Sequence, residues 1–412
     1  MKVAVIGSGI IGLACAYRLA QRGCEVVVLA GRTPGSGASV GNAGWIVPAE
    51  SGPVPGPGIV LQTLKWMLHR DSPLYVRPSV RPSFLAFMTG MLRACNATSY
   101  RHGFDATVRL AAGTMDELDA WVADGIAFEM HREGELRAYV THGEFEAAAA
   151  GLDHLLRAGF EPEVLSGDEA RRLIPELSEA VVHGIRFPNE RHVRPASLVA
   201  GLVARCRELG VAIVEGPVER GWALPSGGAE LRGPFGSVAV DAVIVAAGAW
   251  SGKVARLFGA SVPIRPGKGY AVDYVPSPST MRTPVMLAEA HCVMTPLAGG
   301  LRVAGTMEFG ALDEKVNDIR VRAIKRAPRR YFRDWDPDAP SGAPTVGLRP
   351  MAPDGLPVIG RLDPYQNVYI ASGHAMLGVT LAARTATELS TMVLDGTMPE
   401  VLAPFSPRRF GA

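Results

Sequence analysis

Two glycine-rich segments, one near each end of the chain, constrain the fold more than any other feature of the sequence. The first places Gly7, Gly9 and Gly12 directly after the apolar run 2–6, and a second apolar run covers residues 25–29. This order is typical of a βαβ unit that binds a dinucleotide through a Gly-x-Gly-x-x-Gly turn. The glycines let backbone N–H groups and the start of a helix approach a pyrophosphate, whose charge the helix dipole favours. The sequence therefore predicts a dinucleotide-binding fold that begins at its first strand.

The second glycine-rich segment, residues 372–378, follows the apolar run 367–371. It predicts another turn from a strand into a helix. One cofactor that needs both a pyrophosphate turn and a separate turn beside its ring system is FAD. We therefore expect a flavoenzyme whose cofactor domain is assembled from distant stretches of the chain.

The end of the second predicted strand departs from the usual dinucleotide pattern. Ala30 stands where an acidic side chain would hold the adenosine ribose, and Arg32 follows two residues later. Two interpretations stay open at this point. Arg32 could accept a 2′-phosphate, which would indicate NADP. Alternatively, FAD binds with its ribose held by backbone groups or by another residue.

Composition and charge argue against several other classes of function. The 412 residues are too many for one ordinary core, and the net charge of +2 predicts no strong attraction to nucleic acid. The five cysteines are scattered without a Cys-x-x-Cys pair, so we expect neither disulfides nor a thiolate metal site. Asp334, Asp336 and Asp338 lack the glycine and the closing glutamate of a calcium loop, so no metal is expected. We see no signal peptide and no membrane-spanning run, and we expect a cytoplasmic protein.

The βαβ character of the two ends is interrupted by stretches of mixed helical and strand-like pattern, which suggests two discontinuous domains. We expect a cofactor domain and a substrate domain. The cofactor domain would consist of residues 1–75, 190–262 and 343–412, and the substrate domain of residues 76–189 and 263–342.

The segment 59–95 allows two interpretations. The run 59–68 predicts an amphipathic helix, and 84–88 begins another. The basic residues that flank these stretches are Arg70, Arg77, Arg81 and Arg93. Either the apolar faces pack into the core, or the segment makes a peripheral contact with the inner face of the cell membrane.

Four segments together resemble the D-amino acid oxidase superfamily of FAD-dependent oxidoreductases, and most closely its bacterial D-amino acid dehydrogenase branch. They are the first glycine turn 7–12, the Asn-Ala-Gly loop 39–45, the Gly-Leu-Arg-Pro to Pro-Asp-Gly stretch 346–360, and the closing turn 372–380. The resemblance covers nearly the whole chain. It implies an α/β plus α+β fold, with a Rossmann-like FAD-binding domain and a discontinuous antiparallel-sheet substrate domain.

The resemblance also implies an activity. The expected reaction is FAD-dependent oxidative deamination of D-amino acids, D-proline-like or small and apolar, to imino and then 2-oxo acids. Hydride would pass from the α-carbon to the flavin, and electrons then to a quinone or other carrier. A glycine- or sarcosine-type amine oxidase that uses oxygen is the alternative, and a non-catalytic FAD-binding subunit is another.

Three side chains are candidates for catalysis. A planar guanidinium can grip a carboxylate through two hydrogen bonds, and in the resembling family the arginine at Arg349 does so. Tyr270, in a Lys-Gly-Tyr sequence, is expected to contact substrate or to fill the core. His374, in the closing turn, is expected to donate toward flavin or substrate, or to cap the helix.

The expected FAD contacts lie in three of these segments and at three further places, Arg32, Val218 and the turn at 247–248. Val218 is assigned to adenine by the resemblance alone. The expected cofactor-binding residues are Gly7, Gly9, Ile10, Ile11, Gly12, Arg32, Asn42, Ala43, Gly44, Val218, Ala247, Gly248, Gly373, His374, Gly378, Val379 and Thr380.

Overall fold

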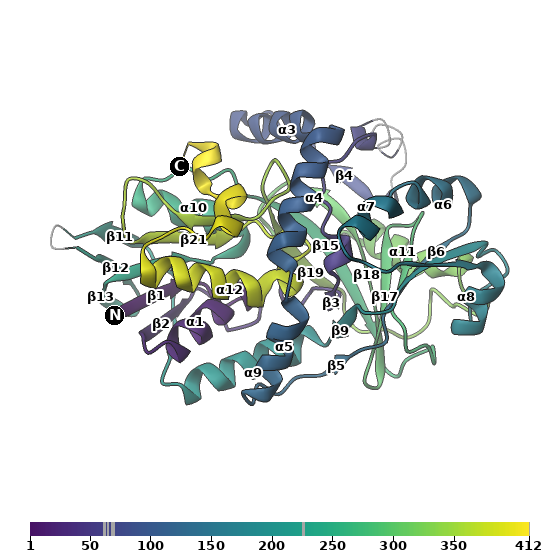
Figure 1. Cartoon of the computed structure of the whole chain (residues 1–412), viewed down its shortest axis with the longest axis horizontal. Helices are drawn as coiled ribbons and strands as arrows, with labels where there is room; N and C mark the ends of the chain where they lie inside the picture. Colours follow the sequence, from purple (N-terminus) through teal and green to yellow (C-terminus); the bar gives the residue numbers. More distant parts are fainter. Residues whose placement is uncertain (61–62, 64–65, 67–70, 225–226, 412) are drawn as a thin grey trace.

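The computed structural model describes residues 1–60, 63, 66, 71–224 and 227–411. Two large sheets lie toward opposite ends of the long axis of the molecule, and helices pack on both (Figure 1). The predicted helix 59–68 lies mostly outside the described residues.

The first sheet is a six-stranded, mainly parallel sheet. Its strands are β1 (Lys2–Ile6), β2 (Glu25–Ala30), β10 (Ala212–Glu215), β14 (Ala242–Val245), β20 (Val358–Arg361) and β21 (Val368–Ser372). They lie in the order β10-β2-β1-β14-β21-β20, and only β20 runs antiparallel to its neighbour. The strands read as nearly unbroken apolar runs because both faces of the sheet are buried. The predicted βαβ opening and the Rossmann-like fold are confirmed.

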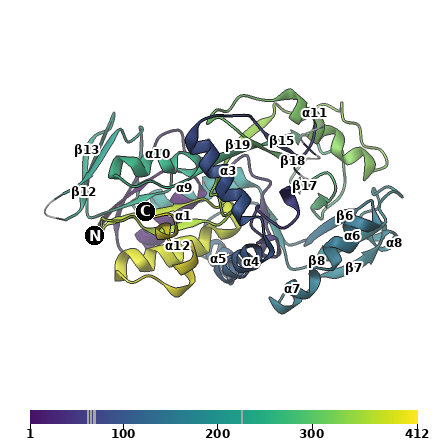
Figure 2. The same ribbon diagram turned by 90° about the horizontal axis from the view of Figure 1, so that it is seen from above.

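Alternate residues of these strands enter two different cores. Val3 and Val5 pack into the core on the helical face, whereas Ala4 and Ile6 pack into the core on the opposite face. The helices of the first core are α1 (Ile10–Gln21), α4 (Ala97–Ala111), α5 (Thr114–Ala123), α9 (Pro195–Glu208) and α12 (Gly378–Asp395). The opposite face carries α10 (Ser251–Ala255) and a small antiparallel sheet of β11 (Arg220–Ala223), β12 (Ala229–Gly233) and β13 (Gly236–Val240). This small sheet projects at the end far from the second large sheet (Figure 2).

The second large sheet has nine strands and is mainly antiparallel. They are β4 (Leu74–Val76), β6 (Glu135–Tyr139), β7 (Glu163–Ser166), β8 (His183–Phe187), β15 (Arg265–Tyr274), β16 (Val285–Leu287), β17 (Cys292–Leu297), β18 (Gly300–Phe309) and β19 (Thr345–Met351). The order is β19-β15-β18-β17-β16-β6-β8-β7, and β4 also pairs with β18. Only the β16–β6 and β18–β4 pairs are parallel. Strand β19 therefore lies in the second sheet, while β20 and β21, from the same stretch of chain, lie in the first.

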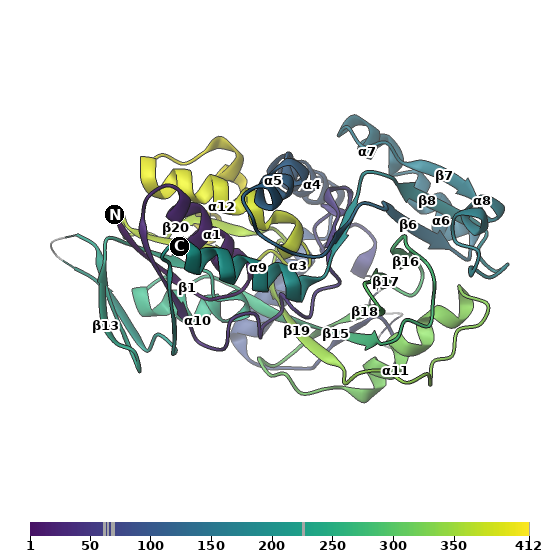
Figure 3. The ribbon, with the colours of Figure 1, turned by 90° about the horizontal axis from the view of Figure 1, so that it is seen from below.

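Helices cover the second sheet in two groups. Helix α11 (Asp318–Arg326) packs against β15 and β18 (Figure 3). Helices α6 (His142–Ala149), α7 (Leu152–Arg157) and α8 (Gly167–Leu173) accompany β6, β7 and β8. A short three-stranded sheet of β3 (Trp45–Ile46), β9 (Arg191–Val193) and β5 (Met130–His131) lies between the two large sheets.

Helix α3 (Pro82–Ala94) confirms the second helix predicted in the segment 59–95. Phe84, Phe87 and Met91 are buried on one side of it, whereas Leu85 and Leu92 are about half exposed. No helix within the described part of the chain is long and apolar enough to cross a membrane.

Candidate active site

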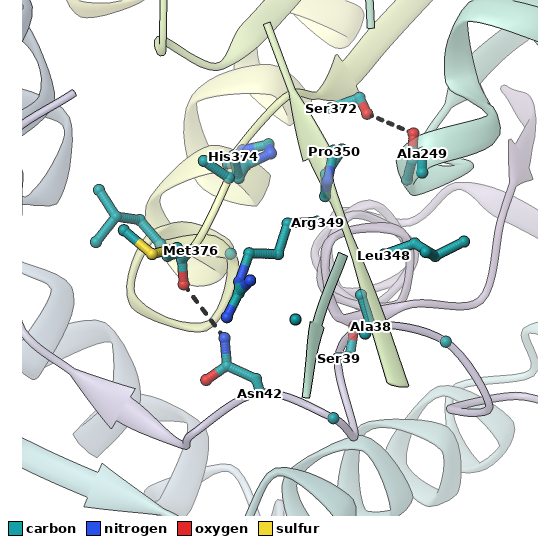
Figure 4. Close-up of a pocket in the computed structure, with 18 of the residues that line it drawn as sticks. Ala38, Ser39, Asn42, Ala249, Leu348, Arg349, Pro350, Ser372, His374 and Met376 are labelled. Atoms are coloured by element: carbon teal, nitrogen blue, oxygen red, sulfur yellow. Dashed lines mark hydrogen bonds between the residues drawn. The ribbon is translucent and has the colours of Figure 1, made fainter. Parts of the chain in front are cut away.

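One cavity of about 1390 Å³ joins the two large sheets. It extends from the turn after β1, past the closing turn before α12, to the inner side of α3. Its wall is mostly apolar, with a few polar side chains that converge on it (Figure 4). The carboxyl ends of β1, β14 and β21 meet at this cavity, which is where open α/β sheets bind ligands.

The first glycine turn is built for close backbone approach. Gly7 has a φ of +121°, and a Cβ atom there would lie 2.3 Å from the carbonyl oxygen of Ala246. A Cβ atom on Gly12 would lie 2.0 Å from the carbonyl oxygen of Gly7, so this glycine serves the packing of helix on strand. Gly7, Gly9 and the first helical residues line the cavity, whereas Gly12 does not. The start of α1 is thus open to an anionic group.

Arg32 lies at the cavity but its charge is already paired. Its guanidinium forms an ion pair with Glu314 at 2.5 Å and stacks over the ring of Trp250, 4.5 Å from the ring centroid. A carboxylate at this distance competes with a phosphate, which weighs against the NADP interpretation. Val218, from the turn after β10, lines the same end of the cavity.

The Asn-Ala-Gly loop is held against the closing turn. The Asn42 side chain donates to the carbonyl oxygen of Met376 at 3.2 Å (Figure 4). It also accepts from the Gly44 N–H at 2.7 Å. Arg302 donates to the carbonyl oxygens of Val40 and Asn42, both at 2.7 Å. Asn42 and Ala43 line the cavity, while Gly44 lies behind the wall. Gly44 has a φ of +87°, and a Cβ atom there would lie 2.1 Å from the carbonyl oxygen of Val193.

The closing turn continues the cavity wall beside this loop. Gly378 and Val379 line the cavity at the start of α12, and Ala247 and Gly248 line it after β14. Thr380 is turned away, because its hydroxyl donates to the carbonyl oxygen of Trp45 and accepts from the Val47 N–H, both at 3.2 Å.

Two residues of the closing turn have roles that the sequence left open. Gly373, with a φ of +77°, does not line the cavity and lies against Val358. His374 is 2% exposed, borders the cavity, and bonds to the Thr385 hydroxyl through Nε2 at 3.0 Å. Burial lowers the pKa of His374 to about 3, so the imidazole is neutral at physiological pH.

Arg349 projects from β19 into the cavity (Figure 4). Its Nη1 donates to the carbonyl oxygen of Thr306 at 2.8 Å. Among the described residues no carboxylate forms an ion pair with it, and burial lowers its pKa to about 10. A desolvated guanidinium without an anion is an arrangement suited to receive one.

Tyr270 is not at the cavity. Its ring lies in the core beneath α11, and its hydroxyl donates to a carboxylate oxygen of Glu308 at 3.1 Å. Successive residues of a strand face opposite sides of the sheet, and Gly269 is the one that lines the cavity. The structure therefore gives Tyr270 the second of its two expected roles, a place in the core, and does not bring it together with Arg349 and His374.

Several cavity residues were not predicted from the sequence. Ser39, which accepts a hydrogen bond from the Ile10 N–H at 3.0 Å, lay in the loop quoted above but carried no separate signal. Thr306 comes from β18, and Glu50 from the turn that follows β3. The apolar wall on the side of α3 includes Val54, Val76, Met88, Met91 and Leu92. These residues are distant in sequence, and no local motif marks them.

Glu50 connects the cavity wall to a buried group of acids. It pairs with Arg137 at 2.9 Å, and Arg137 also pairs with Glu135 at 3.1 Å. Glu190 accepts a hydrogen bond from the Ala49 N–H at 3.0 Å. Burial, together with the nearby Glu50 charge, raises the pKa of Glu135 to about 7, and burial raises that of Glu190.

The geometry fits a flavin dinucleotide. The cavity is long enough to reach from the pyrophosphate turn to both sheets, and the glycine cradle at its start leaves no room for side chains. The remaining space beside Arg349 has a fixed cation and an apolar wall, as an amino acid substrate requires.

Comparison with known proteins gives consistent matches along the chain. The family model described as FAD dependent oxidoreductase matches residues 2–392. The D-amino acid dehydrogenase of Granulibacter bethesdensis is 32% identical over 410 residues, covering 97% of each chain. That of Sinorhizobium medicae is 31% identical and covers all of both chains. Among solved structures, glycine oxidase from Geobacillus kaustophilus matches with a TM-score of 0.78 at 23% identity, covering 98% of this chain and 97% of the other. L-proline dehydrogenase from P. horikoshii matches with a TM-score of 0.74 at 18% identity, covering 99% and 97%.

Proposed function

The chain belongs to the family of FAD-dependent oxidoreductases, and we propose that it oxidises D-amino acids to imino acids, which hydrolyse in water to 2-oxo acids. The observation that carries the proposal is the Arg349 guanidinium, partly buried at the cavity wall without an ion-pair partner among the described residues. Its free donors match the carboxylate that every amino acid substrate has. The relatives named D-amino acid dehydrogenase support the D configuration.

FAD, when bound, supplies the acceptor for the hydride that leaves the substrate α-carbon. In our assignment the turn at Gly7 and Gly9, with the start of α1, holds the pyrophosphate, and Val218 lies at the adenine. The loop at Asn42 and the closing turn at Gly378 and Val379 would flank the flavin, because both line the cavity near Arg349. Gly12, Gly44, Gly373 and Thr380 would support these segments from behind.

The protein contributes orientation more than acid–base chemistry in this scheme. Arg349 fixes the carboxylate and the apolar wall takes the side chain, so that the two contacts together would present one face of the α-carbon to the cofactor. The neutral amine's own lone pair assists the departure of hydride, and His374, which borders the same cavity, stays neutral. No side-chain base is then needed at the α-carbon.

The apolar wall supports substrates with apolar side chains. Val54, Val76 and Met88 line the part of the cavity next to α3, away from the glycine turn. Small apolar or D-proline-like side chains would bury their surface there at about 25 cal/mol per Å².

Helix α3 also supports a route for the electron acceptor. Leu92 lines the cavity and is at the same time 55% exposed, and Leu85 on the same helix is 51% exposed. The sequence has no acidic residue from 72 to 104, whereas Arg77, Arg81 and Arg93 lie there. An apolar and basic surface next to the cavity suits a peripheral contact with anionic lipid. A quinone dissolved in that membrane could then accept electrons from the enzyme.

Anaerobic reduction tests the function directly. The purified yellow enzyme is mixed with D- and L-amino acids, sarcosine and glycine, and the flavin absorbance is followed. Bleaching by apolar D-amino acids is expected. Bleaching by sarcosine, glycine or L-amino acids alone would contradict the proposal. Reoxidation by a water-soluble quinone, compared with oxygen, then tests the acceptor.

Sedimentation with vesicles tests the membrane contact. Wild type should sediment with vesicles that contain anionic lipid, and Leu85→Ser should reduce this without changing flavin reduction. Equal sedimentation of both proteins would contradict a contact through α3.

A further inference from the structure

The pairing of β15 with β18 is irregular next to Arg349. Tyr270 lies opposite Gly305 and Lys268 lies opposite Glu308, so that two residues of β18, Thr306 and Met307, face the single residue between them on β15. This is the arrangement of a β-bulge, a feature that re-aims side chains beside active sites. Thr306 has a φ of +62°, which is rare and costly for a β-branched residue.

Gly269, the residue opposite the bulge, provides space for the guanidinium. A Cβ atom built on Gly269 would lie 2.1 Å from Nη1 of Arg349 and 2.4 Å from both Cζ and Nη2. Arg349 itself lies opposite Gly267 on β15, two residues along the strand. Its side chain therefore runs along the surface of β15 and ends over the glycine.

Thr306 holds the far end of the same side chain. Its carbonyl oxygen accepts the hydrogen bond from Nη1 at 2.8 Å, because the left-handed conformation breaks the regular pairing of β18 at this residue. The Thr306 hydroxyl is buried without a hydrogen-bond partner among the described atoms. The hydrogen bond to Arg349 is therefore made by the backbone of Thr306 and not by its hydroxyl.

We propose that Gly269 and the Thr306 bulge are positioning elements for Arg349. Gly269 leaves the space in which the guanidinium lies, and the Thr306 carbonyl fixes Nη1, so that the other donors stay free for a carboxylate. The inference rests on the proposed function, since it assigns how the carboxylate-binding arginine is held.

Gly269→Ala is the main test. The added methyl group displaces the mobile end of one side chain and not the backbone, so the fold and the FAD content should be retained. A misplacement of about 1 Å is enough to lower kcat/KM for a D-amino acid on the order of 100-fold. Gly342→Ala is the matched control. It adds the same methyl group beside Asp273 of β15, away from the cavity, with its nearest atom at an ordinary 3.4 Å. It should change kcat/KM by less than about 3-fold.

Two measurements separate positioning from general damage. In an Arg349→Ala background, Gly269→Ala should cost nothing further, because it acts through the arginine. Affinity for propionate, a carboxylate without an amine, is measured from the shift that it causes in the flavin absorbance. It should fall in Gly269→Ala by the same order as kcat/KM.

A variant of Thr306 tests the role of its backbone. Thr306→Val keeps the backbone carbonyl and removes only the hydroxyl, so it should lower propionate affinity far less than Gly269→Ala does. A collapse of Thr306→Val would overturn the backbone account in favour of a hydroxyl contact with substrate.

Other outcomes also overturn the inference. One is a propionate affinity in Gly269→Ala that equals that of wild type. The other is a loss of kcat/KM from Gly269→Ala that is as large in the Arg349→Ala background as in the wild-type background. Failure of the proposed function would look different, because no D-amino acid would then reduce the wild-type flavin, while the propionate comparison would still report on positioning.

Discussion

Replacement of Arg349 by alanine separates two effects of this residue. One is the cost to folding stability of desolvating its guanidinium, and the other is its contribution to binding the substrate carboxylate. Burial lowers the Arg349 pKa from 12.5 to about 10, and one pKa unit corresponds to about 1.4 kcal/mol. The charged residue thus costs the folded protein about 3 kcal/mol at neutral pH, where it is ionised in both the folded and unfolded states. The hydrogen bond to the Thr306 carbonyl offsets about 1–2 kcal/mol of this cost.

Arg349→Ala should therefore be no less stable than wild type, while its catalysis collapses. Loss of a charge-assisted contact to a buried carboxylate typically costs about 2–5 kcal/mol, or roughly thirty to several thousand-fold in kcat/KM. Arg349→Lys should recover only part, because an ammonium lacks the planar two-point grip.

The assay combines thermal unfolding of the yellow holoenzyme with anaerobic flavin reduction by a D-amino acid. Residual turnover of an amine that lacks the carboxylate is the internal control, and it should be similar in both proteins. A variant that unfolds earlier or loses FAD would show that Arg349 is structural. Near-normal turnover of amino acids would equally refute its assignment as the carboxylate anchor.

Three further variants test the rest of the site. Gly7→Ala should lose FAD and fold poorly, because a Cβ atom there would lie 2.3 Å from the Ala246 carbonyl oxygen; a yellow, stable variant would contradict this. Tyr270→Phe should keep kcat and KM within about 2-fold of wild type. It should lose about 1 kcal/mol of stability, because the hydrogen bond to Glu308 is removed; a large fall in kcat would show that the Tyr270 hydroxyl acts in catalysis. Burial raises the pKa of Glu135 from 4.5 to about 7 in the folded state, so this group by itself contributes a loss of stability of about 3 kcal/mol between those pH values. Glu135→Gln should lose most of this slope in urea unfolding, and an unchanged slope would show that Glu135 ionises normally.

The cofactor end of the molecule could be predicted from the sequence because local rules determine it. The turn after β1 needs glycines within six residues of one another, and the strands on both sides are apolar because they are buried on both faces. The closing turn before α12 follows the same logic. The significance of Arg32 could not be settled in this way, because its partner Glu314 is distant in the sequence.

The substrate end depends on strand register, which the sequence does not display. The choice between the two expected roles of Tyr270 stayed open because a pattern of apolar residues does not say which face of β15 meets the cavity. The small sheet β11–β13 was also missed, since it packs on a face of the first sheet that no motif marks. Glu50 and Arg137 meet only because the turn after β3 lies against β6.

Two unfavourable features of this fold lie at the same place, beside β15. Arg349 is desolvated without an ion-pair partner among the described residues, and Thr306, which holds it, is in a left-handed conformation. Each costs stability in the free protein, and neither is needed to form the sheet. A substrate carboxylate would form an ion pair with Arg349 and so offset its desolvation. The left-handed conformation of Thr306 already fixes the geometry in which that ion pair forms. The cost of orienting the substrate is then met during folding and not in the reaction, which is the arrangement expected of a preorganised site.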